Sequence, residues 1–284
     1  MFRLAIAMLL LPTSVFAQES APFASFVGAS DPILNDPHDL AIGPDGNLYI
    51  ADKFANQVAI MDPDTLEVIS SIGDGALFGA HDVSFGPDGR LYVAATGLSA
   101  VVVYDMSGTT PVNVGTLGPF PRTEGVLAHS NGRIYVMASG TGQLFSVDGD
   151  RVAATASGMV GAHDVAEAPD GTIWVADNFH RRLVQFAEDL EPMHMLQGAQ
   201  YGFVGPRYLD FDSSGFIYVA DQEAHRILKI DLIANEVLGV IGTGQPGKGP
   251  GLLDDPEGVV SRGAEFFFAD SDNNRIVKYI VVLN

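Results

Sequence analysis

The chain has 284 residues, of which 47% are hydrophobic, so it can bury a large core and is not a disordered polypeptide. Its 15 basic and 35 acidic residues give a net charge of −20, which disfavours binding to the phosphate backbone of nucleic acids. It contains no cysteine, so no disulfide can stabilise the fold. Stability must therefore come from packing and hydrogen bonding.

The N-terminal residues have the pattern of a signal peptide. Arg3 provides positive charge, residues 4–11 form an apolar run, and residues 15–17 (Val-Phe-Ala) resemble a cleavage site. The run is too short to span a bilayer, and no later segment qualifies, so we expect no membrane span. We predict that residues 1–17 are a signal peptide, that residues 18–284 form one domain, and that the mature protein is periplasmic or secreted.

One motif then recurs six times, each time with a short apolar strand, a tight turn and a second strand that contains an aromatic residue. Residues 38–52 (His-Asp-Leu-Ala-Ile-Gly-Pro-Asp-Gly-Asn-Leu-Tyr-Ile-Ala-Asp) are a clear copy. The turn glycines lie at intervals of 43, 43, 39, 44 and 48 residues, which is the period of β-propeller blades. These glycines are Gly46, Gly89, Gly132, Gly171, Gly215 and Gly263.

Two further strands complete each copy, so we predict an all-β fold with six blades of four strands. In the first copy, residues 57–61 are the predicted third strand and residues 66–70 the fourth. The last copy has no room for a fourth strand after residue 280. A strand predicted at residues 23–27 precedes the first blade, and we expect it to pair with the last blade and close the ring.

The repeats resemble the NHL repeat over nearly the whole of residues 18–284. The resemblance depends on the second strand that ends in Ala-Asp and the third that begins with Asn-Arg-Ile, as in residues 266–276. It implies a six-bladed β-propeller of the NHL type. We interpret the Asp and the Arg as structural residues that tie these two strands together. Ala95 and Ala138 replace the aspartate in the second and third blades.

The residue that opens each inner strand is polar in all six repeats, whereas the residue two positions later is always apolar. Inner strands of a propeller begin at the same face, near the mouth of the central channel. Their first side chains should therefore converge on one site. These residues are His38, His81, Glu124, His163, Arg207 and Glu257.

Three of the six are histidines, and converging neutral imidazoles are typical ligands of an open zinc site. We predict that His38, His81 and His163 bind a divalent metal, with zinc as the preferred ion. Glu124 is a candidate fourth ligand or base. The alternative is that all six are ordinary polar residues that bond to water or to neighbouring loops. The residues predicted to contact a substrate are Glu124, Arg207, Glu257 and Lys53.

An aspartate follows each of the three histidines. Asp39, Asp82 and Asp164 should point to the opposite side of their strands, because successive side chains of a strand alternate. They therefore cannot orient the histidines that precede them. We expect them to accept hydrogen bonds from backbone groups between blades.

The placement of the histidines resembles the zinc site of peptidyl-α-hydroxyglycine α-amidating lyase, which is also an NHL-type propeller. This resemblance implies a lyase that acts on a carbinolamide-like substrate. Phe54 and Phe179 stand at the position of that family's catalytic tyrosine, and a phenyl ring cannot transfer a proton. Lys53 is the nearest substitute for an arginine that the family places after the strand-ending aspartate. The resemblance therefore favours the metal site over the amidating reaction.

Two classes of function remain. The first is an exported propeller whose metal site binds a small molecule or a peptide, with a lyase or hydrolase reaction left open. The second is a non-catalytic module that binds a protein partner, which is the commonest use that the NHL resemblance implies. Some NHL proteins bind nucleic acid through a basic face, but the net charge of this chain argues against such a partner.

Overall fold

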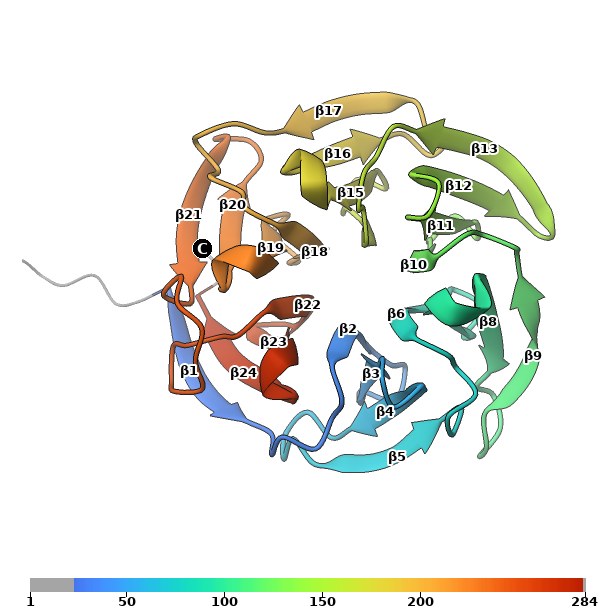
Figure 1. Ribbon diagram of the computed structural model, residues 1–284, viewed down its shortest axis with the longest axis horizontal. Coiled ribbons are helices and arrows are strands. Elements are labelled where there is room, and N and C mark those ends of the chain that lie inside the picture. Colours follow the sequence, from blue (N-terminus) through green and yellow to red (C-terminus); the bar gives the residue numbers. More distant parts are fainter. Residues whose placement is uncertain (1–22, 283–284) are drawn as a thin grey trace, which may run out of the picture.

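The computed structural model describes residues 23–282, which form a closed ring of six four-stranded antiparallel sheets (Figure 1). The predicted all-β, six-bladed β-propeller is confirmed. The predicted signal peptide at residues 1–17 lies outside the described residues. Within residues 23–282, no helix has the length and apolar character needed to cross a membrane.

Each blade runs outward from the axis through four strands in chain order, except that the last blade takes its outer strand from the N-terminal side. The inner strands are β2 (Pro37–Ile42), β6 (Ala80–Phe85), β10 (Thr123–Ala128), β14 (Val165–Glu167), β18 (Pro206–Phe211) and β22 (Pro256–Arg262). The second strands are β3 (Leu48–Asp52), β7 (Leu91–Ala95), β11 (Ile134–Ala138), β15 (Ile173–Asp177), β19 (Ile217–Asp221) and β23 (Glu265–Asp270). The third strands are β4 (Gln57–Met61), β8 (Ala100–Asp105), β12 (Gln143–Asp148), β16 (Arg182–Phe186), β20 (Arg226–Asp231) and β24 (Arg275–Val281). The outer strands are β5 (Val68–Ile72), β9 (Val112–Leu117), β13 (Arg151–Ser157), β17 (Pro192–Leu196), β21 (Glu236–Ile241) and β1 (Ala24–Ala29).

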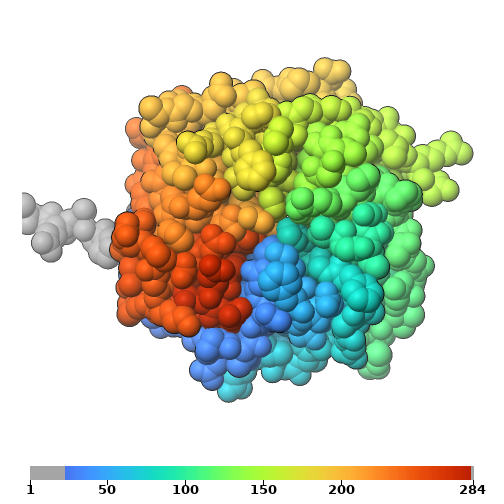
Figure 2. Space-filling model, viewed as in Figure 1, coloured from blue at the N-terminus to red at the C-terminus, as the bar shows by residue number. Residues whose placement is uncertain are grey.

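Short 3-10 turns follow the second strands of four blades and lie on the face seen in Figure 1. They are η1 (Thr96–Leu98), η2 (Asn178–His180), η3 (Gln222–Ala224) and η4 (Ser271–Asn273). The inner strands begin at this face, which we call the mouth face. The space-filling view shows the blades packed side by side around its centre (Figure 2).

The Pro-Asp-Gly turns end the inner strands at the opposite face. In blade 1, Asp45 Oδ1 accepts a hydrogen bond from the backbone N–H of Asn47 at 3.1 Å, and Gly46 has a φ of 84°. A left-handed φ favours glycine because other residues meet a steric penalty there. These motifs therefore form tight turns, and the turns determine where the inner strands end.

The outer strand of blade 1 begins at Val68, so the prediction of a strand at residues 66–70 was wrong by two residues. Residues 62–67 form a tight turn instead, in which the N–H of Leu66 donates to the carbonyl of Asp62 at 2.8 Å. Leu66 has a left-handed φ of 59° and is buried. Leu66 is apolar because its side chain packs beneath the turn, and it does not belong to the outer strand.

The N-terminal strand closes the ring, as predicted. β1 pairs antiparallel with β24, from Ala24 opposite Val281 to Ala29 opposite Val277. Beyond β1, the N–H of Ser30 donates to the carbonyl of Ile276 at 2.9 Å. The last blade is thereby completed by a strand from the other end of the described chain, and its third strand has no open edge.

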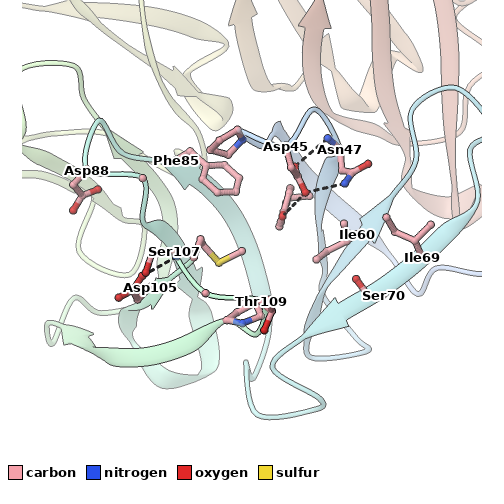
Figure 3. A pocket seen from close by; sticks show the side chains of 16 residues that line it. Asp45, Asn47, Ile60, Ile69, Ser70, Phe85, Asp88, Asp105, Ser107 and Thr109 are labelled. Atoms are coloured by element: carbon pink, nitrogen blue, oxygen red, sulfur yellow. Dashed lines mark hydrogen bonds between the residues drawn. The ribbon is translucent and has the colours of Figure 1, made fainter.

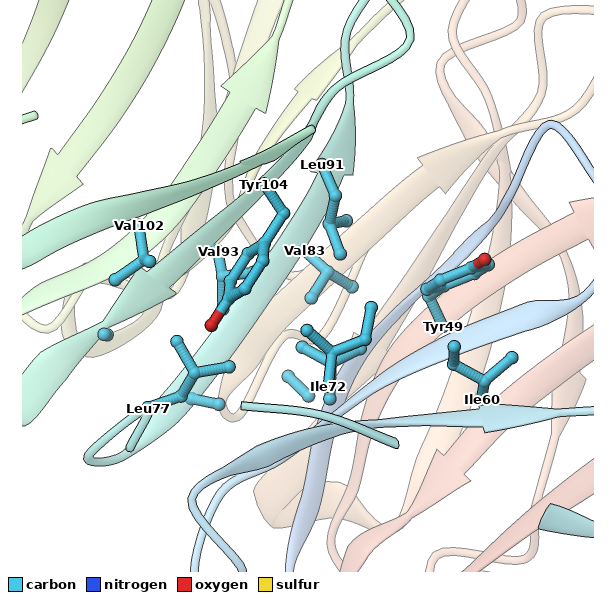
Figure 4. Close-up of a cluster of buried hydrophobic side chains, with 13 residues drawn as sticks. Tyr49, Ile60, Ile72, Leu77, Val83, Leu91, Val93, Val102 and Tyr104 are labelled. Atoms are coloured by element: carbon cyan, nitrogen blue, oxygen red, sulfur yellow. The ribbon is translucent and has the colours of Figure 1, made fainter. Parts of the chain in front are cut away.

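Adjacent blades are held together by apolar side chains of their facing sheets. Figure 4 shows the cluster between blades 1 and 2, in which Tyr49 and Ile72 of blade 1 face Val83, Leu91 and Val93 of blade 2. Leu91 and Val93 are completely buried. Contacts of this kind repeat around the ring and make it a continuous core.

In blades 4 to 6 the strand-ending aspartates bind the arginines that open the third strands, as we expected from the repeat, whereas Asp52 of blade 1 binds Gln57. Asp177 accepts from Arg182 at 2.6 Å, and Asp270 accepts from Arg275 at 2.7 Å. The same aspartates also accept backbone N–H groups of the preceding connection, as Asp177 does from Val160 at 2.7 Å. These buried carboxylates therefore fix the loops of the mouth face.

Deletion of residues 18–30 should lower the melting temperature, because it removes β1 and leaves the edge of β24 unpaired. Each kcal/mol of lost stability lowers the melting temperature of a domain of this size by about 2–4 °C. Thermal unfolding followed by circular dichroism measures the shift. Deletion of residues 18–22 alone keeps all of β1 and serves as the control; an equal melting temperature for both deletions would contradict closure by β1.

Candidate metal centre

The six polar residues predicted to open the inner strands converge at the mouth face. His38, His81, Glu124 and Glu257 are at most 2% exposed, and His163, two residues before β14, is 5% exposed. Arg207 is partly exposed. Glycines make this crowding possible at two places, because a Cβ on Gly125 would lie 2.2 Å from the carbonyl oxygen of His163. A Cβ on Gly258 would lie 2.5 Å from the carbonyl oxygen of His38.

His81, Glu124 and His163 form a group with the composition of a metal site. One ligand atom from each lies within 4.8 Å of the other two, and all three residues are buried. His163 Nε2 is 3.5 Å from Glu124 Oε2, and His81 Nε2 is 3.9 Å from Glu124 Oε1. Two imidazoles and one carboxylate are a known ligand set of catalytic zinc.

The two histidines of this group are neutral. Burial lowers the pKa of His163 to about 3, with a further lowering by the charge of Arg207. Burial also holds the pKa of His81 well below its ordinary value, and nearby His38 and His163 act in the same direction. The Nδ1 of His163 donates to the carbonyl of Gly161 at 2.6 Å, which leaves Nε2 with its lone pair toward Glu124. A neutral imidazole with an oriented lone pair is ready to bind a metal.

The carboxylate of Glu124 is ionised. Burial acts to raise its pKa, and a positive charge on His163 would lower it; with His163 neutral, the Ser139 hydroxyl and the Arg122 guanidinium remain as the groups that lower it. Arg122 Nη2 donates to Oε1 at 2.7 Å, although the arginine side chain itself is exposed. Oε2 is buried and accepts no hydrogen bond from residues 23–282.

Several buried polar atoms of this site have no hydrogen-bond partner within residues 23–282. They include both ring nitrogens of His81 and Oε2 of Glu124. A buried polar atom without a partner costs about 1–3 kcal/mol, so a group of them in one place indicates a ligand or ion. A divalent cation fits this donor set, because it would coordinate the lone pairs that protein groups leave unused.

His38 was predicted as a third metal ligand, and the structure places it beside the group of three but pairs it with Glu257. Its Nδ1 is 2.8 Å from Glu257 Oε2. The centroids of the His38 and His81 rings lie 4.2 Å apart, and the two rings meet edge to face. Neither ring nitrogen makes a hydrogen bond of good geometry with residues 23–282. The role of His38 as a ligand stays a prediction.

Arg207 and Lys53, both predicted to contact a substrate, differ in their surroundings. Arg207 Nε is 3.5 Å from Glu257 Oε1, is buried, and has no hydrogen-bond acceptor within residues 23–282. Gln222 Nε2 donates to the same Glu257 oxygen at 2.6 Å. Lys53 is bound to Asp36 at 2.9 Å, so its charge is already balanced. Arg207 therefore has a donor available for a ligand, and Lys53 lies at the rim.

Tyr208 lies beside the histidines and was missed in the sequence. It belongs to blade 5, yet its hydroxyl donates to the backbone carbonyl of His81 in blade 2, across the axis, at 3.1 Å. The centroid of its ring lies 6.3 Å from the ring centroid of His38 and 6.4 Å from that of His163. The sequence signal was present: the equivalent position is Asp or Gly in the other five blades.

The three aspartates that follow the histidines bridge blades, as expected. Asp82 Oδ2 accepts the N–H of Val126 at 2.8 Å, and Asp164 Oδ2 accepts that of Leu209 at 2.6 Å. Asp39 makes the equivalent, longer contact with Val83 at 3.4 Å. Asp39 and Asp82 also line a separate cavity of about 220 Å³ nearer the opposite face.

A larger cavity of about 550 Å³ lies between blades 1 and 2 at the turns of the opposite face (Figure 3). Its wall contains Tyr49, Phe85 and Ile60, and no histidine, lysine or arginine lines it. Its carboxylates already serve local turns, as Asp45 does with Asn47 (Figure 3). This cavity therefore offers no alternative metal site.

Comparisons with known proteins agree with the fold. The model of the NHL repeat matches residues 34–60, so the chain is a six-bladed β-propeller that carries an NHL repeat. A segment of 42 residues is 45% identical to the PE-PGRS family protein PE_PGRS18 of Mycobacterium tuberculosis. That match covers 15% of this chain and only 9% of the relative's length.

Solved structures share the architecture at low identity. A protein of unknown function from Bacteroides thetaiotaomicron superposes with a TM-score of 0.74 at 17% identity, covering 91% of this chain and 75% of that chain. Virginiamycin B lyase from Staphylococcus aureus superposes with a TM-score of 0.63 at 12% identity, covering 87% of this chain and 95% of that chain. The PQQ-bound aldose sugar dehydrogenase from Streptomyces coelicolor superposes with a TM-score of 0.66 at 13% identity, covering 91% of this chain and 98% of that chain. These likenesses show the fold alone.

Substitution Gly258→Ala should destabilise the protein by about 1–3 kcal/mol, the usual cost of overpacking. The new Cβ would lie 2.5 Å from both the His38 carbonyl oxygen and the Leu40 side chain. Urea denaturation measures the loss. Gly28→Ala is the control, because nothing lies within 4 Å of a Cβ there. Equal stability of the two variants would show that blades 6 and 1 do not need this close approach.

Proposed function

We propose that the protein binds a divalent metal, with zinc preferred, through His81, Glu124 and His163, and uses it to bind a small molecule or a peptide at the mouth face. The observation that carries the proposal is the group of mutually close ligand atoms, in which both ring nitrogens of His81 and Oε2 of Glu124 are buried and have no hydrogen-bond partner in residues 23–282. A bound metal would supply a Lewis acid for an oxygen of the ligand. The surrounding residues keep the site out of water and orient the side chains that would bind the metal.

The chemistry that we propose for this site is a lyase or hydrolase reaction. The fold is compatible with it, since a structural neighbour is named virginiamycin B lyase. His38, Glu257 and Arg207 lie beside the same group and are the residues available to move a proton or hold a charge. With residues 1–17 removed as a signal peptide, the site would work in the periplasm or outside the cell.

Exposed aromatic side chains around the mouth support a ligand with apolar parts. Phe54, Phe78 and Phe179 are 61%, 55% and 66% exposed, and all three lie in connections of the mouth face. Exposed apolar side chains grouped on one face commonly mark binding surfaces. Phe54 also lies under the ammonium group of Lys53, at 4.6 Å.

Protein dialysed against zinc and then against buffer should retain one equivalent of metal, measured by elemental analysis. Glu124→Gln and the double variant His81→Ala/His163→Ala should lose it, because each removes ligands from the group. His194→Ala is the control, since His194 is an exposed residue of β17. A wild-type protein without stoichiometric metal, and without stabilisation by added zinc, would contradict the proposal.

A protein-interaction module is the second candidate, and the same exposed aromatic residues favour it. It predicts that Phe54→Ala/Phe179→Ala abolishes capture of a protein partner while metal content stays unchanged. His81→Ala/His163→Ala should then leave that capture intact. The metal-site function predicts the reverse dependence, so partner capture and metal content together separate the two candidates.

A further inference from the structure

The polar residues of the mouth repeat after three blades. Taken around the ring they are His38, His81 and Glu124 in blades 1 to 3, then His163, Arg207 and Glu257 in blades 4 to 6. A half-turn about the ring axis therefore places histidine on histidine and glutamate on glutamate. The one difference is that Arg207 takes the place of His81.

The contacts repeat in the same way. Glu124 of blade 3 contacts His163 of blade 4 at 3.5 Å, and Glu257 of blade 6 contacts His38 of blade 1 at 2.8 Å. Glu124 lies 3.9 Å from His81 of blade 2, and Glu257 lies 3.5 Å from Arg207 of blade 5. The site therefore has two similar halves, each with a glutamate between two partners, although His163 faces its glutamate through Nε2 and His38 through Nδ1.

The backbone repeats this relation. Gly125 admits the His163 carbonyl and Gly258 admits the His38 carbonyl, so both glutamates are followed by a glycine for the same reason. The halves are thus alike in their scaffold as well as in their side chains. The halves differ in where the positive charge comes from: the guanidinium beside Glu257 belongs to Arg207, whereas the equivalent His81 is neutral and the guanidinium beside Glu124 belongs to Arg122. The position equivalent to Arg122 beside Glu257 is Asp255.

The charges indicate what binds between the two halves. At the centre of the site, the carboxylates of Glu124 and Glu257 lie against the guanidiniums of Arg122 and Arg207. A divalent cation beside Glu124 would give this inner group a net positive charge. The site would then have a metal on one side and a guanidinium on the other, and an anion would be attracted to both.

We propose that the ligand carries a carboxylate, which binds between the metal in the His81–Glu124–His163 half and the guanidinium of Arg207 in the other half. This inference rests on the proposed metal site and names the class of ligand that it takes. Arg207 suits the task because its Nε is buried and has no acceptor within residues 23–282. Its Nη1 is already held by Gln222, which fixes the direction of the remaining donors.

Titration of Co²⁺-loaded protein with acetate tests the proposal. Acetate should shift the visible absorption of the bound Co²⁺ with a saturable affinity, and acetamide, its neutral analogue, should not. Arg207→Ala should weaken acetate binding by about tenfold or more, and Arg207→Lys should weaken it less because the charge remains. Arg90→Ala, at an exposed turn of the opposite face, should have no effect.

The outcomes separate the two proposals. If wild-type protein binds no Co²⁺, the metal site is wrong and the ligand proposal fails with it. If Co²⁺ binds but acetate and acetamide act alike, or if both Arg207 variants bind acetate as tightly as wild type, only the ligand proposal is overturned. Thermal unfolding of each variant confirms that the ring is intact before binding is compared.

The equivalence of the two halves has its own test. Arg207→His should create a second metal site with His38 and Glu257, so the zinc content should rise from one equivalent to two. The Arg207→Ala protein should keep one equivalent of zinc, because alanine adds no ligand. The Arg207→His/Glu257→Gln protein should also bind one equivalent, because the second site loses its carboxylate. If Arg207→His protein also retains one equivalent, the two halves are not equivalent in metal binding and the half-turn relation carries no chemical meaning.

Discussion

The site depends on the crowding of six inner strands at one end of a narrow axis. Each strand brings its first side chain to the same small volume, and backbone from neighbouring blades excludes water from it. Burial penalises charge, so the imidazoles of His81 and His163 are neutral. It also leaves lone pairs and N–H groups without water, and that cost is recovered only when something binds to them. The same geometry that closes the propeller therefore leaves these groups available to the ligand that we propose.

A binding site of this kind needs a rigid frame, since its groups come from all six blades. The frame is closed by β1 on β24 and by apolar contacts between adjacent sheets. The mouth connections are tied by buried carboxylates such as Asp177 and Asp270, each of which binds an arginine and a backbone N–H. Ligand atoms held in this way lose little freedom on binding, which favours affinity.

The repeat made most of the fold predictable, because a fixed period, a turn glycine and alternating strands each point to the same propeller blade. The convergence of the six polar residues followed from the fold alone. Their grouping did not, because the period says which residues share a ring but not which side chains touch. His38 of blade 1 pairs with Glu257 of blade 6, far away in the sequence, whereas His81 pairs with Glu124 of the next blade. Tyr208 reaches across the axis to the backbone of His81, and no local pattern predicts such a contact.

The half-turn relation gives a physical reason for the single departure from it. If position 207 were also histidine, each glutamate would have two imidazole partners, and the pocket would offer two metal sites in contact through the neighbouring rings of His38 and His81. Two divalent cations in neighbouring sites repel each other, so the second would bind more weakly than the first. Arg207 places one fixed positive charge beside Glu257 and needs no ion from solution, so in the proposed site the other half is the place for the metal. Under that proposal the symmetric frame would carry a site with two chemically different ends, which would orient an unsymmetrical ligand.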